Sequence, residues 1–138
     1  DMFQEARHAA LIQKFSAGDA TAMPGDLALR LATQNGARAL GFGASGTIAP
    51  GRAADLILLD CSAPHLQPRH DLAASVLYAA GSQDVSDVMV AGKWLLRNRA
   101  LLTLDEARIR DEVERRAERL AAHRLPPMRR YPVGESTV

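Results

Sequence analysis

Residues 46–60 read GTIAPGRAADLILLD, and this stretch predicts a short strand, a tight turn and a second strand. Pro50 sets φ near about −65° and Gly51 tolerates positive φ, as the central positions of a type II turn require. Leu56 to Leu59 form an apolar run between aspartates, which is typical of a strand covered on both faces. We interpret Asp55 and Asp60 as groups that bound this strand on its two sides and stabilise a turn, not as metal ligands.

The composition indicates one ordered domain. The chain has 138 residues, 47% of them hydrophobic and 4% aromatic, which favours helix-rich packing. The net charge of +1 provides no field to attract nucleic acid or a membrane. The single cysteine, Cys61, excludes an intrachain disulfide, and no apolar run is long enough to span a bilayer. The cytoplasm is the expected location.

The residues before the turn predict helices. Residues 2–15 form an apolar helix that stops near Gly18 and is expected to be buried on both sides. Pro24 suits the first turn of a second helix. Thr33 is expected to end that helix and to cap a short third one, from residue 35 to residue 40, before the glycines at 41 and 43.

The residues after the turn predict a loop, a helix and a β-meander. Residues 61–70 form the loop, and Asp71 is expected to cap a helix over 72–80 that Gly81 ends. Strands are predicted over 85–91, 94–96 and 100–102, with turns at 92–93 and 98–99.

A final helix is predicted from a capping box, with Thr103 at the N-cap and Glu106 three residues later. It runs to about His123, and Pro126-Pro127 ends it before a tail over 128–138. The charged face is expected to be solvated. Three ion pairs at helical spacing and a narrow apolar stripe are predicted: Glu106–Arg110, Asp111–Arg115 and Glu112–Arg116, and Ile109, Val113, Ala117, Leu120 and Ala121.

The side chains that could carry chemistry form no complete site. Neither His8 nor His123 belongs to a His-x-His pair or a His-Glu-x-x-His motif. The densest group of potential metal ligands lies on one loop and consists of Cys61, His65, His70 and Asp71. Structural roles are favoured for that group. Ser45 lacks the strand–turn–helix context of a nucleophile elbow, and the glycines over 41–46 follow a helix, unlike those of a dinucleotide loop.

The chain resembles the C-terminal portion of the cytosine-deaminase-like amidohydrolases, over residues 1 to about 120. The resemblance is carried by the first helix (DMFQEARHAALIQK), by residues 29–33 and 35–41, by the 46–60 hairpin, by PHLQP with His70-Asp71, and by VMVAGKW at 88–94. The nearest branch contains the 5′-methylthioadenosine/S-adenosylhomocysteine deaminases and the triazine chlorohydrolases.

This resemblance implies an α/β fold. Residues 1–44 would be the last helices of a (β/α)8 barrel, residues 45–104 part of a small composite β-sandwich that includes the helix near 72–80, and residues 105–138 a charged helix and tail. It also implies a divalent metal, usually zinc in this family, whose ligands and the proton-transfer residues all precede residue 1. No catalytic, cofactor-binding or metal residue is therefore assigned, and Asp1 is not a ligand.

Two other readings stay open: a non-catalytic structural or interaction module, and an independent metal-binding protein that uses Cys61, His65 and His70. The chain starts inside a predicted helix at Asp1, which suggests a piece of a longer enzyme whose missing barrel portion is its partner. The family commonly associates, so a homo-oligomer is possible. The exact substrate and the leaving group, ammonia or halide, are open. Without its partner the chain is expected to be inactive and to fold poorly or aggregate, because its strands leave an exposed edge.

Overall fold

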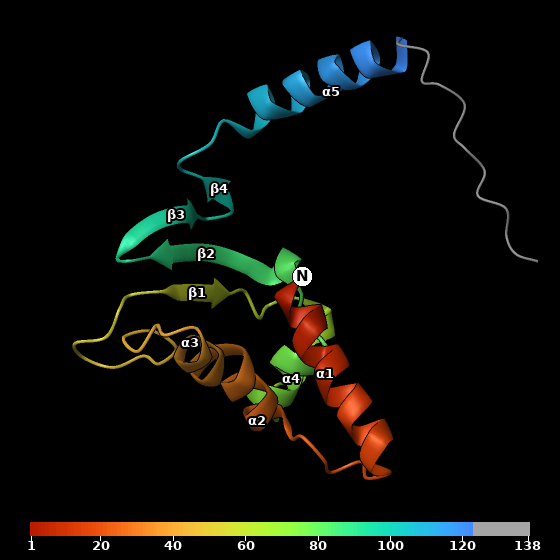
Figure 1. Cartoon of the computed structure of the whole chain (residues 1–138), viewed down its shortest axis with the longest axis vertical. Coiled ribbons are helices and arrows are strands. Elements are labelled where there is room, and N and C mark those ends of the chain that lie inside the picture. Colours follow the sequence, from red (N-terminus) through yellow and green to blue (C-terminus); the bar gives the residue numbers. More distant parts are fainter. Residues whose placement is uncertain (123–138) are drawn as a thin grey trace, which may run out of the picture. The chain divides into compact units, whose positions relative to one another are not determined.

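A computed structural model describes residues 1–122 of the chain. It divides into two compact units, Asp1–Thr103 and a second that starts at Leu104. The first unit combines helices with a four-stranded antiparallel sheet in the order β1-β2-β3-β4 (Figure 1). Its helices are α1 (Met2–Ala17), α2 (Gly25–Arg30), α3 (Gly36–Ala39) and α4 (Leu72–Tyr78), and its strands are β1 (Leu56–Leu59), β2 (Val85–Val90), β3 (Lys93–Arg97) and β4 (Ala100–Leu101).

Helix α1 is bounded as predicted but is not buried on both sides. Asp1 caps it by accepting a hydrogen bond from the Phe3 amide at 2.8 Å, and Gly18 ends it in the left-handed conformation, φ 62°. Phe15 is 90% exposed and Ala10 is the buried residue of this helix. The expectation of a fully buried helix is therefore wrong for residues 1–122, because no described element covers that apolar face.

The second and third predicted helices form one continuous helical segment. Pro24 lies at the N-cap directly before α2 and not in its first turn, where it was expected, and a π-helical turn, η1 (Leu31–Asn35), leads directly into α3. Thr33 neither ends nor caps a helix, so that prediction is wrong. Its hydroxyl donates to the Leu29 carbonyl at 2.7 Å, an intrahelical bond that lets a threonine continue a helix.

The 46–60 stretch forms its turn and its second strand. The Arg52 amide donates to the Ala49 carbonyl at 3.1 Å and Gly51 has φ 80°, which confirms the turn at Pro50-Gly51. The first strand is absent. Gly46 has φ 87° and lies so close to η1 that a Cβ would be 2.8 Å from Gln34 Cα. This position is therefore bent away from an extended strand.

Strand β1 is the edge of the sheet. Among the described residues it pairs with β2 alone, in antiparallel register from Leu56↔Met89 to Leu59↔Val85. Ile57 is 53% exposed and Leu58 is 44% exposed. Coverage on both faces, expected from the apolar run, is not present among the described residues.

The meander β2–β3–β4 confirms the sequence pattern. Ala91-Gly92 and Asn98-Arg99 all have positive φ, the conformation that two-residue hairpin turns require. The first turn lies one residue earlier than predicted.

The Asp71 carboxylate accepts from the Ala74 amide at 2.9 Å, which confirms the cap of α4, although this helix ends at Tyr78. A 3-10 turn, η2 (Pro64–Leu66), interrupts the predicted loop.

The second unit contains α5 (Glu106–Ala122). Its cap is Asp105, which accepts from the Arg108 amide at 3.0 Å, and not Thr103. Glu106–Arg110 (3.5 Å) and Glu112–Arg116 (2.7 Å) are confirmed, whereas Arg115 pairs with Glu112 at 2.8 Å in place of Asp111. The predictions for His123, Pro126-Pro127 and 128–138 lie outside the described residues.

The core of the first unit is small. Ala10, Ala28 and Leu77 form its buried cluster, where α1, α2 and α4 meet, and Ala6 and Met23 pack against it. Over residues 1–122, no helix has both the length and the hydropathy needed to cross a membrane.

Candidate functional site

The loop residues that resembled a ligand group do not assemble into one. His65 Nε2 lies 3.0 Å from Asp84 Oδ2, and the Cys61 thiol lies 3.8 Å from the Leu59 carbonyl oxygen. Within the described part of the chain, no three His, Cys, Asp or Glu side chains are placed to hold a metal ion. The geometry of residues 1–122 therefore offers no support for a metal site at Cys61, His65 and His70.

Ser45 contacts a carboxylate and not the histidine base that commonly activates a serine. Its hydroxyl donates to Asp55 Oδ2 at 2.7 Å, and Asp55 Oδ1 accepts from the Ala91 amide at 2.7 Å. These hydrogen bonds lower the pKa of Asp55, the Ala91 amide most of all. Asp55 thus links the start of β1 to the β2–β3 turn, the structural role interpreted from the sequence.

The densest polar contacts gather at residues 79–84, which connect α4 to β2 and are called the junction below. Asp84 ends a 3-10 turn, η3 (Ser82–Asp84), and is only 3% exposed. Its Oδ2 accepts from the buried Gly81 amide at 2.9 Å and contacts His65. Sequence reasoning did not select Asp84, because nothing in the local pattern SQDV distinguishes it from a surface aspartate.

The environment of Asp84 keeps its carboxyl group ionised. The hydrogen bond from His65 is the largest cause that lowers the pKa of Asp84, and the Gly81 amide acts in the same direction, while burial opposes both. A carboxylate only accepts hydrogen bonds, so Nε2 of His65 carries the proton in this contact. His65 is therefore a donor that satisfies a buried charge.

Helix α1 is tied to the junction by two side chains. Arg7 Nε donates to the Leu77 carbonyl at 3.1 Å, and Arg7 Nη2 donates to the Ala80 carbonyl at 2.8 Å. Asp1 Oδ2 accepts from the Ser82 amide at 3.2 Å. Figure 1 shows the N-terminal end of α1 beside the start of β2, as these bonds require.

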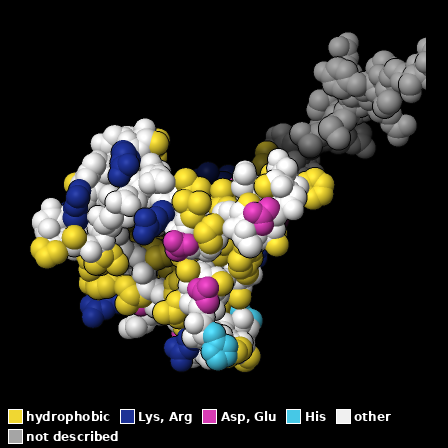
Figure 2. All heavy atoms as spheres, turned by 90° about the horizontal axis from the view of Figure 1, so that it is seen from below, with side chains coloured by type: hydrophobic (Ala, Val, Ile, Leu, Met, Phe, Trp, Pro, Cys, Tyr) yellow, Lys and Arg dark blue, Asp and Glu magenta, His cyan; other side chains and the backbone are white. Residues whose placement is uncertain are grey.

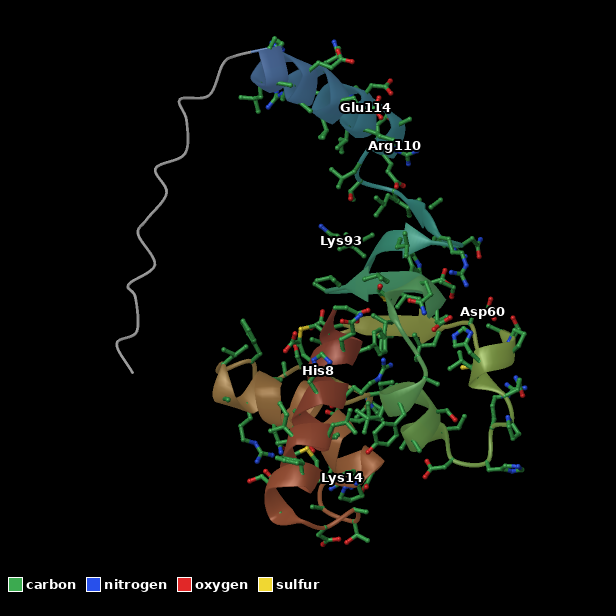
Figure 3. All side chains as sticks on the ribbon, turned by 90° about the vertical axis from the view of Figure 1, so that its right-hand side faces the viewer. His8, Lys14, Asp60, Lys93, Arg110 and Glu114 are labelled. Atoms are coloured by element: carbon green, nitrogen blue, oxygen red, sulfur yellow. The ribbon has the colours of Figure 1, made fainter. Side chains whose placement is uncertain are left out.

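Residues beside the strands, Arg99 and Asp60, tie the sheet to the junction. Arg99 donates to the Gln83 carbonyl and pairs with Asp60 at 3.3 Å, and the Asp60 amide donates to the Asp84 carbonyl at 2.8 Å. Hydrogen bonds with Ser62, followed by Arg99, lower the pKa of Asp60. Figure 3 shows Asp60 at the end of β1 and His8 on α1.

The other prominent feature is an apolar groove of about 350 Å³ in the first unit. Its lining comes from α1, the α2–η1 segment, β1 and α4: Met2, Phe3, Ala6, Leu29, Ala32, Thr33, Ile57, Leu59, Val76 and Leu77. Figure 2 shows hydrophobic side chains spread over one face of the molecule, between isolated charged groups. Met2 and Ile57, which line the groove, are 70% and 53% exposed, and exposed large apolar side chains gathered in a groove fit an interaction surface.

The comparisons with known proteins agree with one another. Residues 1–95 match the amidohydrolase family. The chain is 49% identical over 120 residues to a 5-methylthioadenosine/S-adenosylhomocysteine deaminase of Pelotomaculum thermopropionicum, covering 87% of this chain. It is 45% identical over 122 residues to the Halobacterium salinarum protein of the same name. It spans 28% of the length of each of these relatives.

Solved structures give the same picture. An adenosine deaminase from Xanthomonas campestris with bound zinc matches at a TM-score of 0.82 and 43% identity, over 89% of this chain and 28% of that protein. Atrazine chlorohydrolase from Arthrobacter aurescens, complexed with zinc, matches at a TM-score of 0.73 and 26% identity, over 82% of this chain and 25% of that protein.

Proposed function

Because the chain belongs to the amidohydrolase family, we propose that it is the C-terminal part of a hydrolase that deaminates an adenosine-type nucleoside. The observation that carries this proposal is the 49% identity to a 5-methylthioadenosine/S-adenosylhomocysteine deaminase of which the chain spans only 28%. An S-adenosylhomocysteine- or methylthioadenosine-like substrate is thereby favoured over a triazine. A zinc-bound adenosine deaminase with 43% identity supports the same chemistry.

The metal would be held by another part of the enzyme. Residues 1–122 contain no ligand set that fits a zinc ion, since His65 is committed to Asp84 and no donor triad forms in that range. The chain therefore contributes no ligand to the metal in this proposal. The metal's ligands and the proton-transfer groups belong, in this proposal, to the residues that precede α1.

The chain's own contribution is a scaffold with an open apolar side. In this proposal residues 1–44 complete a barrel and residues 45–104 complete a small β domain, with residues 105–138 as a C-terminal helix and tail. The apolar groove and the unpaired edge of β1 support the arrangement, because both are surfaces that packing with a further part of the enzyme would cover. A cytoplasmic location and a homo-oligomeric state remain predictions.

The test uses the full-length protein that contains this chain, purified with zinc. It is incubated with S-adenosylhomocysteine, 5′-methylthioadenosine, adenosine and a chlorinated triazine, and both ammonia and chloride release are measured. We expect ammonia from a purine nucleoside, lost on treatment with a chelator and restored by zinc. Chloride from the triazine alone would replace the proposed substrate class, and no turnover with any compound would favour a non-catalytic module.

A further inference from the structure

We propose that Asp1 and Arg7 clamp the start of α1 onto the junction, and that Arg7 is thereby a positioning residue for the deamination. The inference rests on the proposed function, in which the catalytic residues lie on the chain that enters α1. The clamp joins segments that are 70 to 81 positions apart in the sequence, since Arg7 bonds Leu77 and Ala80 and Asp1 bonds Ser82.

The Arg7 contact is specific in geometry. Two nitrogens of one planar guanidinium reach two different carbonyls, at 3.1 and 2.8 Å, and the side chain is half-buried. These carbonyls lie at the C-terminal end of α4, where backbone oxygens lack intrahelical partners and attract a cation. Because the guanidinium is rigid and planar and bonds both oxygens, it sets the direction of α1 as well as its distance from α4.

Asp1 fixes the end of the same helix. One oxygen accepts from the Phe3 amide at 2.8 Å and caps α1, and the other accepts from the Ser82 amide at 3.2 Å. One carboxylate therefore holds both the first turn of α1 and the junction. The backbone that leads into residue 1 is held at this point.

The junction can serve as a fixed reference because other segments brace it. His65 and the Gly81 amide hold the Asp84 side chain, the Asp60 amide bonds the Asp84 carbonyl, and Arg99 bonds the Gln83 carbonyl. Ala80, Gly81 and Asp84 are all buried. If the Arg7 hydrogen bonds were lost, α1 would then move relative to the junction, which stays in place.

A displacement of this kind has a kinetic signature. A shift of roughly 1 Å in a reacting group, caused by a distant substitution, can cost about 100-fold in rate. A side chain that only adds stability would lower the melting temperature and leave the turnover of each folded, zinc-loaded enzyme unchanged. The two roles are separated by kcat measured per bound zinc, below the melting transition.

The experiment compares Arg7→Gln, Arg7→Lys and the control Arg30→Gln in the full-length protein. Arg30 is exposed and its side chain makes no hydrogen bond or ion pair within residues 1–122, so its variant removes the same charge without breaking a side-chain contact. We expect roughly 10- to 100-fold lower kcat per bound zinc in Arg7→Gln, a smaller loss in Arg7→Lys and wild-type kcat in Arg30→Gln. Wild-type kcat in folded Arg7→Gln would overturn the inference, as would an equal loss in Arg30→Gln. If Arg7→Gln does not fold, Arg7→Lys decides: an unchanged kcat per bound zinc refutes the positioning role.

A second readout separates the clamp from the proposed function. Hydrogen exchange over residues 3–10, at the start of α1, should be faster in Arg7→Gln than in wild type and unchanged in Arg30→Gln. If the wild-type protein does not deaminate, the proposed function is refuted, and the positioning role with it. The hydrogen-exchange measurement would still test the clamp in that case. Unchanged exchange in Arg7→Gln would refute the clamp itself.

Discussion

Removing the Asp84 carboxylate should loosen the junction locally, by an amount that its contacts allow us to estimate. Asp84→Ala leaves the buried Gly81 amide without an acceptor, and a stranded buried donor costs about 1–3 kcal/mol. His65 loses the same acceptor, but its side chain is 44% exposed and can bond water instead, so it adds little. The expected loss corresponds to roughly 5- to 150-fold faster hydrogen exchange.

The assay is hydrogen exchange with mass spectrometry on the full-length protein, read on peptides that cover residues 77–86. Asp111→Ala is the matched control, because Asp111 is exposed and lies on α5 in the second unit. We expect acceleration over 77–86 in Asp84→Ala and none in the control. Equal exchange in Asp84→Ala and wild type would show that the carboxylate does not support the junction, and the reasoning would be wrong.

Three further predictions concern pH, association and metal. Because the folded pKa of Asp84 lies below its ordinary value of 3.8, its stabilising contribution is complete above that value and is lost as the pH falls through the lower folded pKa. The hydrogen-exchange rate over residues 77–86 should therefore be slower in wild type than in Asp84→Asn above pH 3.8, and the two rates should converge only below pH 3.8. A ratio of the two rates that does not change with pH would contradict this prediction. Isolated residues 1–138 should self-associate through β1, where Ile57 is 53% exposed, and Ile57→Lys should reduce the association in light scattering; a monomeric wild-type chain would count against it. His65→Ala should leave the zinc content of the full-length protein unchanged, as measured by elemental analysis, because His65 bonds Asp84; loss of zinc would revive a loop metal site.

Local features were predictable because neighbouring residues determine them. The turn at Pro50-Gly51, the Asp71 cap and the β2–β3–β4 meander each follow from turn, capping or alternation preferences within a few positions. The cap of α5 was misplaced because Thr103 and Asp105 both suit an N-cap. The capping-box spacing favoured Thr103, whereas the helix starts at Glu106 with Asp105 directly before it.

Burial was not predictable in the same way. The apolar patterns of α1 and β1 indicate covered surfaces, yet Phe15 and Ile57 are open in residues 1–122. A hydrophobic pattern indicates that a face of a helix or strand is buried in the complete protein. It does not indicate which segment covers that face. The proposed upstream portion of the enzyme would account for both mismatches.

The junction was missed because its contacts are distant in sequence. Asp84 meets His65 from nineteen positions away, and Arg7 reaches the carbonyls of Leu77 and Ala80. Backbone carbonyls and amides carry no residue-specific signal, so neither the Arg7 hydrogen bonds nor the Asp1–Ser82 bond can be read from the pattern of side chains. Local reasoning interpreted Asp71 correctly and gave no reason to select Asp84.

In the proposed function, this chain is a scaffold, and another part of the same enzyme supplies the chemistry. The most direct measurement determines zinc content and ammonia release for isolated residues 1–138 and for the full-length protein under identical conditions. We expect stoichiometric zinc and zinc-dependent turnover of a purine nucleoside in the full-length protein only. Stoichiometric zinc with turnover in residues 1–138 alone would contradict it.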